Sequence, residues 1–225
     1  DAKTGEDRWR QPRDEATTWA TPLIVEHEGT TQIIVNGSNR TRSYDLATGE
    51  LVWQCGGQVA NPIPSPVAAN GVVYCMSGYQ GYAVAAIPLA ARGDVSDLGG
   101  EVWHSSDAAP YVASPVLVDG FLYFTKGESG ILCCRDAYTG EPPFSKQRLP
   151  QSETMYSSPV AAAGRLYVTD RDGTTNVIRV GANFEILATN QIDDTVGATL
   201  VPIGDKLLIR GASSLYCIGK EEEKL

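Results

Sequence analysis

Short apolar runs separated by turns rich in Gly, Asn and Asp recur along the whole chain. Residues 63–106 hold four such runs: PVAA, then VVYCMS after Asn70-Gly71, then a run within YAVAAIPL after Gln80-Gly81, then EVWHS after a Gly-Gly turn. Asn-Gly supplies the positive φ angles of a two-residue hairpin, so the pattern predicts an antiparallel meander of four strands. A helical period is sustained nowhere, and the chain is therefore predicted to be all-β.

The meander repeats along the chain. Its second copy begins PSPVAANGVVYCMSG (64–78), and related segments are ATPLIV (20–25), ASPVLVDGFLYFTKG (113–127), SSPVAAAGRLYVTDR (157–171) and GATLVPIGDKLLIRG (197–211). The equivalent points Pro22, Pro66, Pro115, Pro159 and Thr199 are separated by 44, 49, 44 and 40 residues. Periods in the forties that contain short strands and Gly-bearing turns are typical of four-stranded propeller blades.

A turn motif lies between these segments. DAKTGEDRW (1–9), DLATGELVW (45–53) and DAYTGEPPF (136–144) share an Asp, a Thr-Gly-Glu turn and an aromatic residue four places after the Gly, and GGEVW (99–103) keeps the last spacing. The Asp can accept bonds from nearby main chain, the Gly tolerates positive φ, and the ring is expected to lie flat against the next sheet. We interpret these residues as scaffold: Gly5, Trp9, Asp45, Gly49, Trp53, Gly99, Trp103, Asp136, Gly140 and Phe144.

The pattern A-x-D-x-x-T-G-E-x-x-W resembles that of quinoprotein-type (PQQ-like) β-propellers. That superfamily includes PQQ-dependent alcohol dehydrogenases and also non-enzymatic members, such as the propeller lipoprotein of the bacterial outer-membrane protein assembly machinery. Departures are Phe144 in place of Trp, the shortened DLGGEVW turn, and VGANFEI (180–186), which has lost the motif. The resemblance implies seven or eight blades, whereas this sequence supplies about five.

The resulting division is a single partial propeller over residues 1–225. Its parts are 1–18 (the end of a preceding blade or a closing strand), blades at 19–55, 63–106, 111–150 and 155–192, a last blade at 196–219, and a charged tail at 220–225. The N-terminal EDRWR could close a five-bladed ring by strand exchange. The same ends are expected if about three N-terminal blades are missing, and we favour this second interpretation because larger rings are typical of the family.

Charge, apolar stretches and cysteine spacing argue against several classes of function. The formal charge is −9 and the sequence pI is about 4.7, and no Lys/Arg cluster occurs that would bind nucleic acid. The longest apolar stretch, YAVAAIPLAA (82–91), is too short for a membrane span. The five cysteines show no CxxC spacing, so neither a complete disulfide framework nor a zinc site is indicated.

No catalytic, cofactor-binding or metal-binding residue is predicted. Adjacent Cys133 and Cys134 invite comparison with the vicinal disulfide of quinoprotein dehydrogenases, but the repeat places Cys134 and Cys217 at a small inward position. TDRDGTT (169–175) is expected to be a hairpin turn rather than a calcium loop. Asp193-Asp194 is expected to be a solvated pair, and no Gly-x-Ser-x-Gly elbow accompanies the two histidines.

One surface is a candidate for binding. In a meander, the loops between strands two and three and the loops between blades emerge on the same face, which would carry Met155 and the following six residues: Tyr79, Tyr111, Lys126, Tyr156, Arg171 and Arg210. Aromatic residues among Arg and Lys on rigid loops are typical of contact surfaces. The alternative is that they are ordinary solvated loop residues.

We therefore expect a non-catalytic PQQ-like propeller that binds a protein or peptide through this face, needs no cofactor, and binds neither nucleic acid nor membrane. One alternative is a fragment of a PQQ- and calcium-dependent alcohol or sugar dehydrogenase; another is a carbohydrate-binding propeller that uses the face tyrosines. The resemblance also implies export to the periplasm or beyond, whereas unpaired cysteines favour a reducing compartment. The missing blades of the same protein are a further possible partner.

Overall fold

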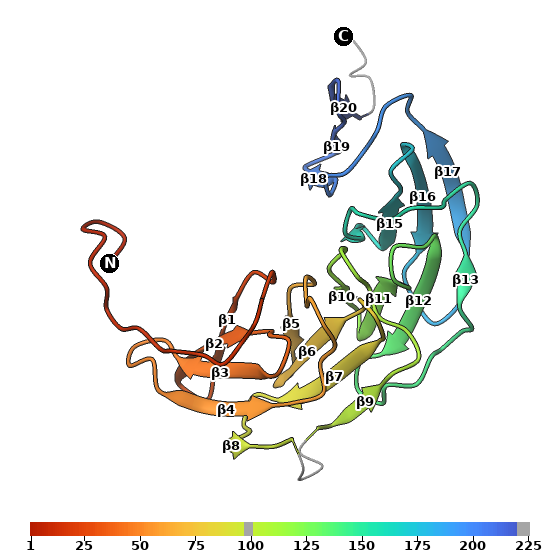
Figure 1. Ribbon diagram of the computed structural model, residues 1–225. Helices are drawn as coiled ribbons and strands as arrows, with labels where there is room; N and C mark the ends of the chain where they lie inside the picture. The colour runs from red at the N-terminus through yellow and green to blue at the C-terminus, as the bar shows by residue number, and fades with distance from the viewer. Residues whose placement is uncertain (97–100, 220–225) are drawn as a thin grey trace. The chain divides into compact units, whose positions relative to one another are not determined.

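The computed structural model describes residues 1–96 and 101–219, and in this part of the chain every regular element is a β-strand (Figure 1). The chain divides into two compact units, Asp1–Asp107 and Ala108–Leu225. Gly99 and the charged tail at 220–225 lie outside the described residues. No described helix is long and apolar enough to cross a membrane.

The first unit holds two sheets. One has the strand order β1-β2-β3-β4-β8 and the bounds β1 Leu23–His27, β2 Thr30–Val35, β3 Thr41–Asp45, β4 Leu51–Cys55 and β8 Gly93–Asp94. The other has the order β5-β6-β7-β9 and the bounds β5 Val67–Ala69, β6 Val72–Ser77, β7 Ala83–Pro88 and β9 Trp103–Ser105. All of these pairings are antiparallel except that of β4 with β8.

Strand β8 comes from a segment that the sequence pattern assigned to the second blade. It lies parallel to β4 at the outer edge of the first sheet, where the Val95 N–H donates to the Gln54 carbonyl at 2.9 Å. Asp94 accepts from Arg40 at 2.7 Å and from the Gln54 amide at 2.9 Å. Hydrogen bonds from Ser96 lower the pKa of Asp94 to about 2. Strand β8 therefore pairs with main-chain groups of β4 that would otherwise be exposed at the edge of the sheet.

The second unit holds three sheets of consecutive antiparallel strands. They are β10 Val116–Val118, β11 Phe121–Thr125, β12 Ile131–Asp136 and β13 Gln147–Arg148; then β14 Val160–Ala162, β15 Arg165–Thr169, β16 Thr174–Arg179 and β17 Ile186–Gln191; then β18 Val201–Ile203, β19 Lys206–Arg210 and β20 Leu215–Ile218. We call them the third, fourth and fifth sheets. Hydrogen bonds link the segments that precede the first strand of each sheet. The Ser114 N–H donates to Ser158 Oγ at 2.9 Å, and the Ser158 N–H donates to Thr199 Oγ1 at 3.0 Å.

Apolar faces are buried between successive sheets of each unit. In the first unit, Trp53 is fully buried with Ile34 of its own sheet and with Cys75 and Ile87 of the next. In the second unit, Tyr123 and Leu132 of the third sheet pack with Leu166 and Ile178 of the fourth. Each sheet therefore supplies a face that its neighbour covers, as the repeat predicts.

The turn motif forms the same hydrogen bonds at each complete copy. Asp45 Oδ1 accepts from the N–H groups two and three residues on, at 2.9 and 2.8 Å, and the Gly49 N–H donates to the Asp45 carbonyl at 2.9 Å. Asp136 makes the same set at 3.0, 2.8 and 2.9 Å, and Asp1 makes it at 2.9, 3.2 and 2.9 Å. These bonds lower the pKa of Asp45 and of Asp136. The motif is thus a self-contained turn.

In two copies of the motif, the aromatic residue contacts the following turn. The Trp9 ring lies on Gly49, where a Cβ atom would collide with the indole, and Trp9 Nε1 donates to the Leu46 carbonyl at 2.8 Å. In the second unit Phe144 takes this role beside Phe184, with ring centroids 5.7 Å apart. Two departures from the motif, Phe144 in place of Trp and the altered turn at 180–186, therefore meet in one contact. There the Phe184 ring takes the place that Gly49 has under Trp9.

The prediction of an all-β fold built of antiparallel sheets, most of them four-stranded, is confirmed. The number of blades in a complete propeller, and the division of the chain into blades, stay predictions. The first sheet has a fifth strand, and the last has three strands among the described residues.

Candidate interaction face

In the second unit, the loops that enter and leave each sheet lie against the hairpin between the sheet's second and third strands. The Gly127 N–H donates to the Ala109 carbonyl at 2.8 Å, and the Met155 N–H donates to the Glu128 carbonyl at 2.7 Å. The Arg171 N–H donates to the Thr154 carbonyl at 2.9 Å. Main-chain bonds therefore hold hairpins and connecting loops together on one side of the third and fourth sheets.

Five of the six residues predicted for the binding surface belong to the second unit. Tyr111 is in the loop before β10, Lys126 follows β11, Tyr156 precedes β14, Arg171 is in the β15–β16 hairpin, and Arg210 ends β19. The tyrosines and Lys126 are half-buried, and both arginines are exposed. Tyr79 is half-buried in the β6–β7 hairpin of the first unit, the equivalent hairpin of its own sheet.

Tyr156 and Arg171 are in direct contact. The Arg171 guanidinium carbon lies 4.6 Å from the centroid of the Tyr156 ring, which is cation–π geometry. The sequence placed both residues on this face without predicting the contact. The contact places an aromatic ring and a positive charge side by side on these loops.

Two expectations for these loops were wrong. Met155 is not on the surface; its side chain is fully buried in the core between the third and fourth sheets. Asp194 is not simply a solvated residue, because its carboxylate accepts from Ser213 Oγ at 2.7 Å and from the N–H groups of Thr195 at 2.8 Å and of Ser214 at 3.1 Å. These bonds, with that from Ser213 Oγ the strongest influence, lower the pKa of Asp194. Asp194 thus ties the β19–β20 hairpin to its entry loop.

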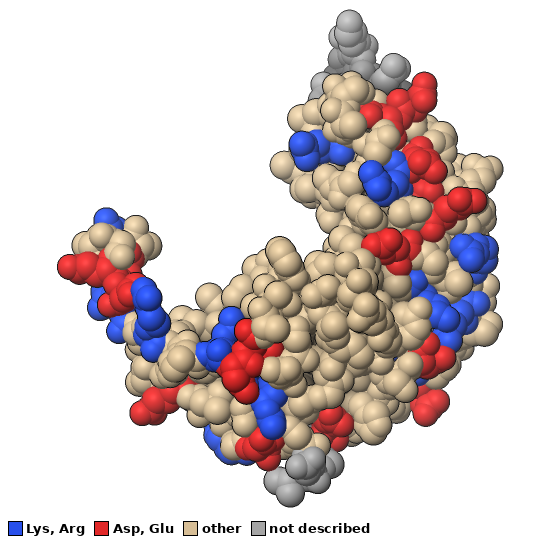
Figure 2. All heavy atoms as spheres, in the orientation of Figure 1, with Lys and Arg blue, Asp and Glu red and all other residues tan. Residues whose placement is uncertain are grey.

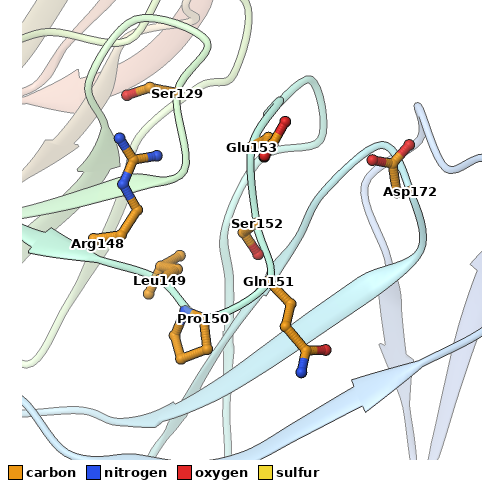
Figure 3. A pocket seen from close by; sticks show the side chains of 8 residues that line it. All are labelled: Ser129, Arg148, Leu149, Pro150, Gln151, Ser152, Glu153 and Asp172. Atoms are coloured by element: carbon orange, nitrogen blue, oxygen red, sulfur yellow. The ribbon is translucent and has the colours of Figure 1, made fainter.

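A hollow of about 780 Å³ opens among these loops (Figure 3). It is lined by Ser129, Arg148, Leu149, Pro150, Gln151, Ser152, Glu153 and Asp172. These residues come from the β11–β12 hairpin, from the end of β13 and the loop after it, and from the β15–β16 hairpin. The polar lining combines one guanidinium with two carboxylates.

The loop at 149–155 is held firmly. The Leu149 N–H donates to the Gly130 carbonyl at 2.9 Å, and the Gly130 N–H donates to the Glu153 carbonyl at 3.0 Å. Gly130 leaves no space for a side chain, because a Cβ atom there would overlap the main chain of Ser152. The buried amide of Asn176 donates to Ser152 Oγ at 2.9 Å. The hollow is therefore a preformed feature of the two sheets rather than a gap between free loops.

The described residues bear on two features of the dehydrogenase alternative, a calcium site and a vicinal disulfide. No group of three or more His, Cys, Asp or Glu side chains in the described ranges is arranged to hold a metal ion. Cys133 and Cys134 are buried free thiols at successive positions of β12, so their side chains point to opposite faces. Burial raises the pKa of Cys134 to about 12, which suits core packing rather than reactivity.

Charge is mixed over the surface. On the face of the molecule that Figure 2 shows, acidic and basic side chains alternate over each unit without forming one basic patch. In the second unit, the hollow's own charges are those of Arg148, Glu153 and Asp172.

Several solved structures share the fold of this chain. BamB from Moraxella catarrhalis is 19% identical with a TM-score of 0.54, and the match covers 96% of this chain and 76% of that one. The computationally designed Ika8 protein is 11% identical with a TM-score of 0.65, over 88% of this chain and 57% of that one. The designed Ika4 protein is 11% identical with a TM-score of 0.53, over 68% and 88%. No curated protein gives a significant match.

The sequence profile of one family matches residues 1–146, which is more than half of the chain. The matched range contains all three complete copies of the Asp-x-x-Thr-Gly-Glu turn. The chain belongs to the family described as outer membrane protein assembly factor BamB.

Proposed function

We propose that this chain is a non-catalytic interaction scaffold that binds a protein partner through the loop face of its second unit. The observation that carries the proposal is the preformed face itself: entry loops and hairpins joined by main-chain bonds, with the Tyr156–Arg171 pair on the same loops as the hollow. Aromatic and Arg side chains on a rigid scaffold are the usual anchors of protein interfaces. Membership in the BamB family supports an interaction role.

The same membership supports a location outside the cytoplasm, in association with an outer membrane. The partner would then be an envelope protein. Further blades of a larger propeller would be a second kind of partner, and they would contact sheet faces rather than these loops.

The test is retention of a partner from an envelope extract by the immobilised protein. The variant carries Tyr111→Ala and Tyr156→Ala, and the matched control is Tyr138→Ala, because Tyr138 is 83% exposed in the turn at the other end of the third sheet. We expect wild type and control to retain the same protein and the double variant to lose it. Retention by the double variant, or by none of the three with all three folded, would contradict the proposed function.

A further inference from the structure

A pocket of about 330 Å³ lies between the fourth and fifth sheets, within the second unit. We call it the inter-sheet pocket, and most of its lining is apolar. Both sheets line it, the fourth with Tyr167, Thr175 and Val177, and the fifth with Leu207, Ile209 and Ile218. The pocket continues the packing between these two sheets, where Val196, Leu200 and Ile209 form the buried core. Its volume lies within the range of ~300–1,000 Å³ that is typical of ligand pockets.

Strand register gives each of these lining residues an equivalent in the first unit. Tyr167 lies opposite Val177 as Ile34 lies opposite Ser43. The six equivalents, in the same order, are Ile34, Thr41 and Ser43 of the first sheet (β1–β4) and Val73, Cys75 and Ile87 of the second (β5–β7). In the first unit these residues surround Trp53, whose ring is fully buried between the two sheets. The lining of the inter-sheet pocket therefore repeats the surroundings of a buried indole.

The fourth sheet has no ring at this position. Trp53 lies opposite Ser43, and Ala188 lies opposite Val177, with a register shift directly after each of the two pairs. Ala188 therefore occupies the repeat position of Trp53, and it is exposed. Between the third and fourth sheets, Phe144 of the turn motif packs against the equivalent core. The inter-sheet pocket is thus the space that an aromatic ring fills between the other neighbouring sheets of each unit.

The loop end of the pocket is already ordered. Gln191 Oε1 accepts from Thr174 Oγ1 at 2.6 Å, and Gln191 Nε2 donates to the Ile192 carbonyl at 3.1 Å. A Cβ atom at Gly173 would overlap the Ile192 carbonyl oxygen, so the hairpin lies directly against the end of β17. Asn190 lines the pocket from the edge strand β17 and is exposed, so the pocket is open at this edge of the fourth sheet. A ring that enters there buries apolar surface with little ordering of the protein.

We propose that the inter-sheet pocket binds an aromatic side chain of a partner protein, with Trp as the side chain of best fit. The repeat identifies the occupant, because the lining that packs on Trp53 recurs here with Ala188 in the place of the ring. The exposed Asn190 amide can both donate to and accept from the main chain of the segment that carries the ring. The site goes beyond the proposed function, because it does not include the Tyr156–Arg171 pair.

The first probe is N-acetyl-L-tryptophanamide, titrated into the ¹⁵N-labelled protein while the amide signals of Gly173, Val177 and Asn190 are followed. N-acetylglycinamide, which lacks the ring, is its control. The second probe is the capped peptide acetyl-Gly-Ser-Trp-Ser-Gly-amide, and its control peptide has Ala in place of Trp. The variant Ala188→Trp fills the pocket from within. Its matched control is Tyr138→Trp, which adds an indole at a position that is 83% exposed in the turn of the third sheet.

We expect both Trp probes to shift these signals saturably in wild type and in Tyr138→Trp, and to bind Ala188→Trp about tenfold or more weakly. The melting temperature of Ala188→Trp should rise by about 2–4 °C, because its indole is buried, while that of Tyr138→Trp stays unchanged.

Absence of saturable shifts in wild type, equal shifts with the ring-free controls, or undiminished binding by Ala188→Trp would each overturn the inference. Binding of the free amide without binding of the peptide would assign the pocket to a small molecule. A wild-type dimer that Ala188→Trp dissociates, seen by sedimentation, would assign it to a second copy of the chain. Either result would also overturn the inference, and neither bears on the loop face, which is unchanged in both variants.

Discussion

The third and fifth sheets carry the same apolar pattern in different surroundings. Their ladders align Val116, Tyr123 and Cys134 with Val201, Leu208 and Cys217. In the third sheet four positions pack toward the fourth sheet: Val116, Val118, Leu132 and Cys134. Their equivalents in the fifth sheet are exposed: Val201 (52%), Ile203 (57%), Leu215 (70%) and Cys217.

The difference shows that the neighbouring sheet, not the residue type, decides whether a repeat position is buried. Within the second unit, no described sheet covers this face of the fifth sheet. It is an apolar face of the kind that a further PQQ-like sheet covers in the rest of the unit. The expectation that Cys217 occupies a buried position like that of Cys134 was wrong for this reason.

The largest expected difference in the free energy of unfolding is that between Ala substitutions at Leu132 and at its equivalent, Leu215. Leu132→Ala removes a fully buried side chain and should lower the free energy of unfolding by about 2–5 kcal/mol. Leu215→Ala should change it by less than about 0.5 kcal/mol because that side chain is already in water. Urea unfolding followed by circular dichroism measures both. Equal losses would show that the fifth sheet is covered as the third is.

A smaller effect is expected at Tyr123, whose hydroxyl bonds the fourth sheet's turn. It donates to the Gly181 carbonyl at 3.0 Å and accepts from the Gly181 N–H at 2.8 Å, whereas the equivalent Leu208 can make neither bond. Tyr123→Phe should lower the free energy of unfolding by about 1–2 kcal/mol, because both Gly181 groups lose a partner. Amide hydrogen exchange at Gly181 should accelerate; unchanged protection there would contradict this contact.

The smallest of the stability effects is expected at Asp194, which joins the fifth sheet's hairpin to its loop. Its pKa is lowered in the folded state, so the ionised form favours folding above the ordinary carboxyl pKa and this contribution is lost as pH falls through the lowered value. Asp194→Asn should therefore be less stable than wild type at pH 7, with the difference shrinking toward pH 3. Urea unfolding at the two pH values checks this. A constant difference would assign the effect to geometry alone.

The scaffold was predictable where each residue's role is local. The Asp45 and Asp136 turns follow from their own sequence, because the carboxylate bonds N–H groups two and three residues away. Strand β8 was not predictable, because Gly93 and Asp94 have no strand pattern and are held by Arg40 and Gln54 of another repeat.

The candidate face was predictable only in outline. Repeat alignment placed Tyr156 and Arg171 in loops that meet, since hairpin and entry loop recur in each copy. The hollow could not be found in this way, because Ser129, Glu153 and Asp172 converge from three segments whose sequences do not repeat. Glu153 and Arg148 carry no signal beyond being charged loop residues. Convergence of that kind depends on tertiary packing rather than on periodicity.

The most direct test of the comparison is thiol alkylation of the native protein, with each cysteine quantified by mass spectrometry after digestion. Cys134 and Cys217 occupy the same repeat position, one buried against the fourth sheet and one exposed. We predict that iodoacetamide modifies Cys217 in the folded protein and reaches Cys134 only after unfolding in urea. Protection of Cys217 equal to that of Cys134 would contradict the open face of the fifth sheet.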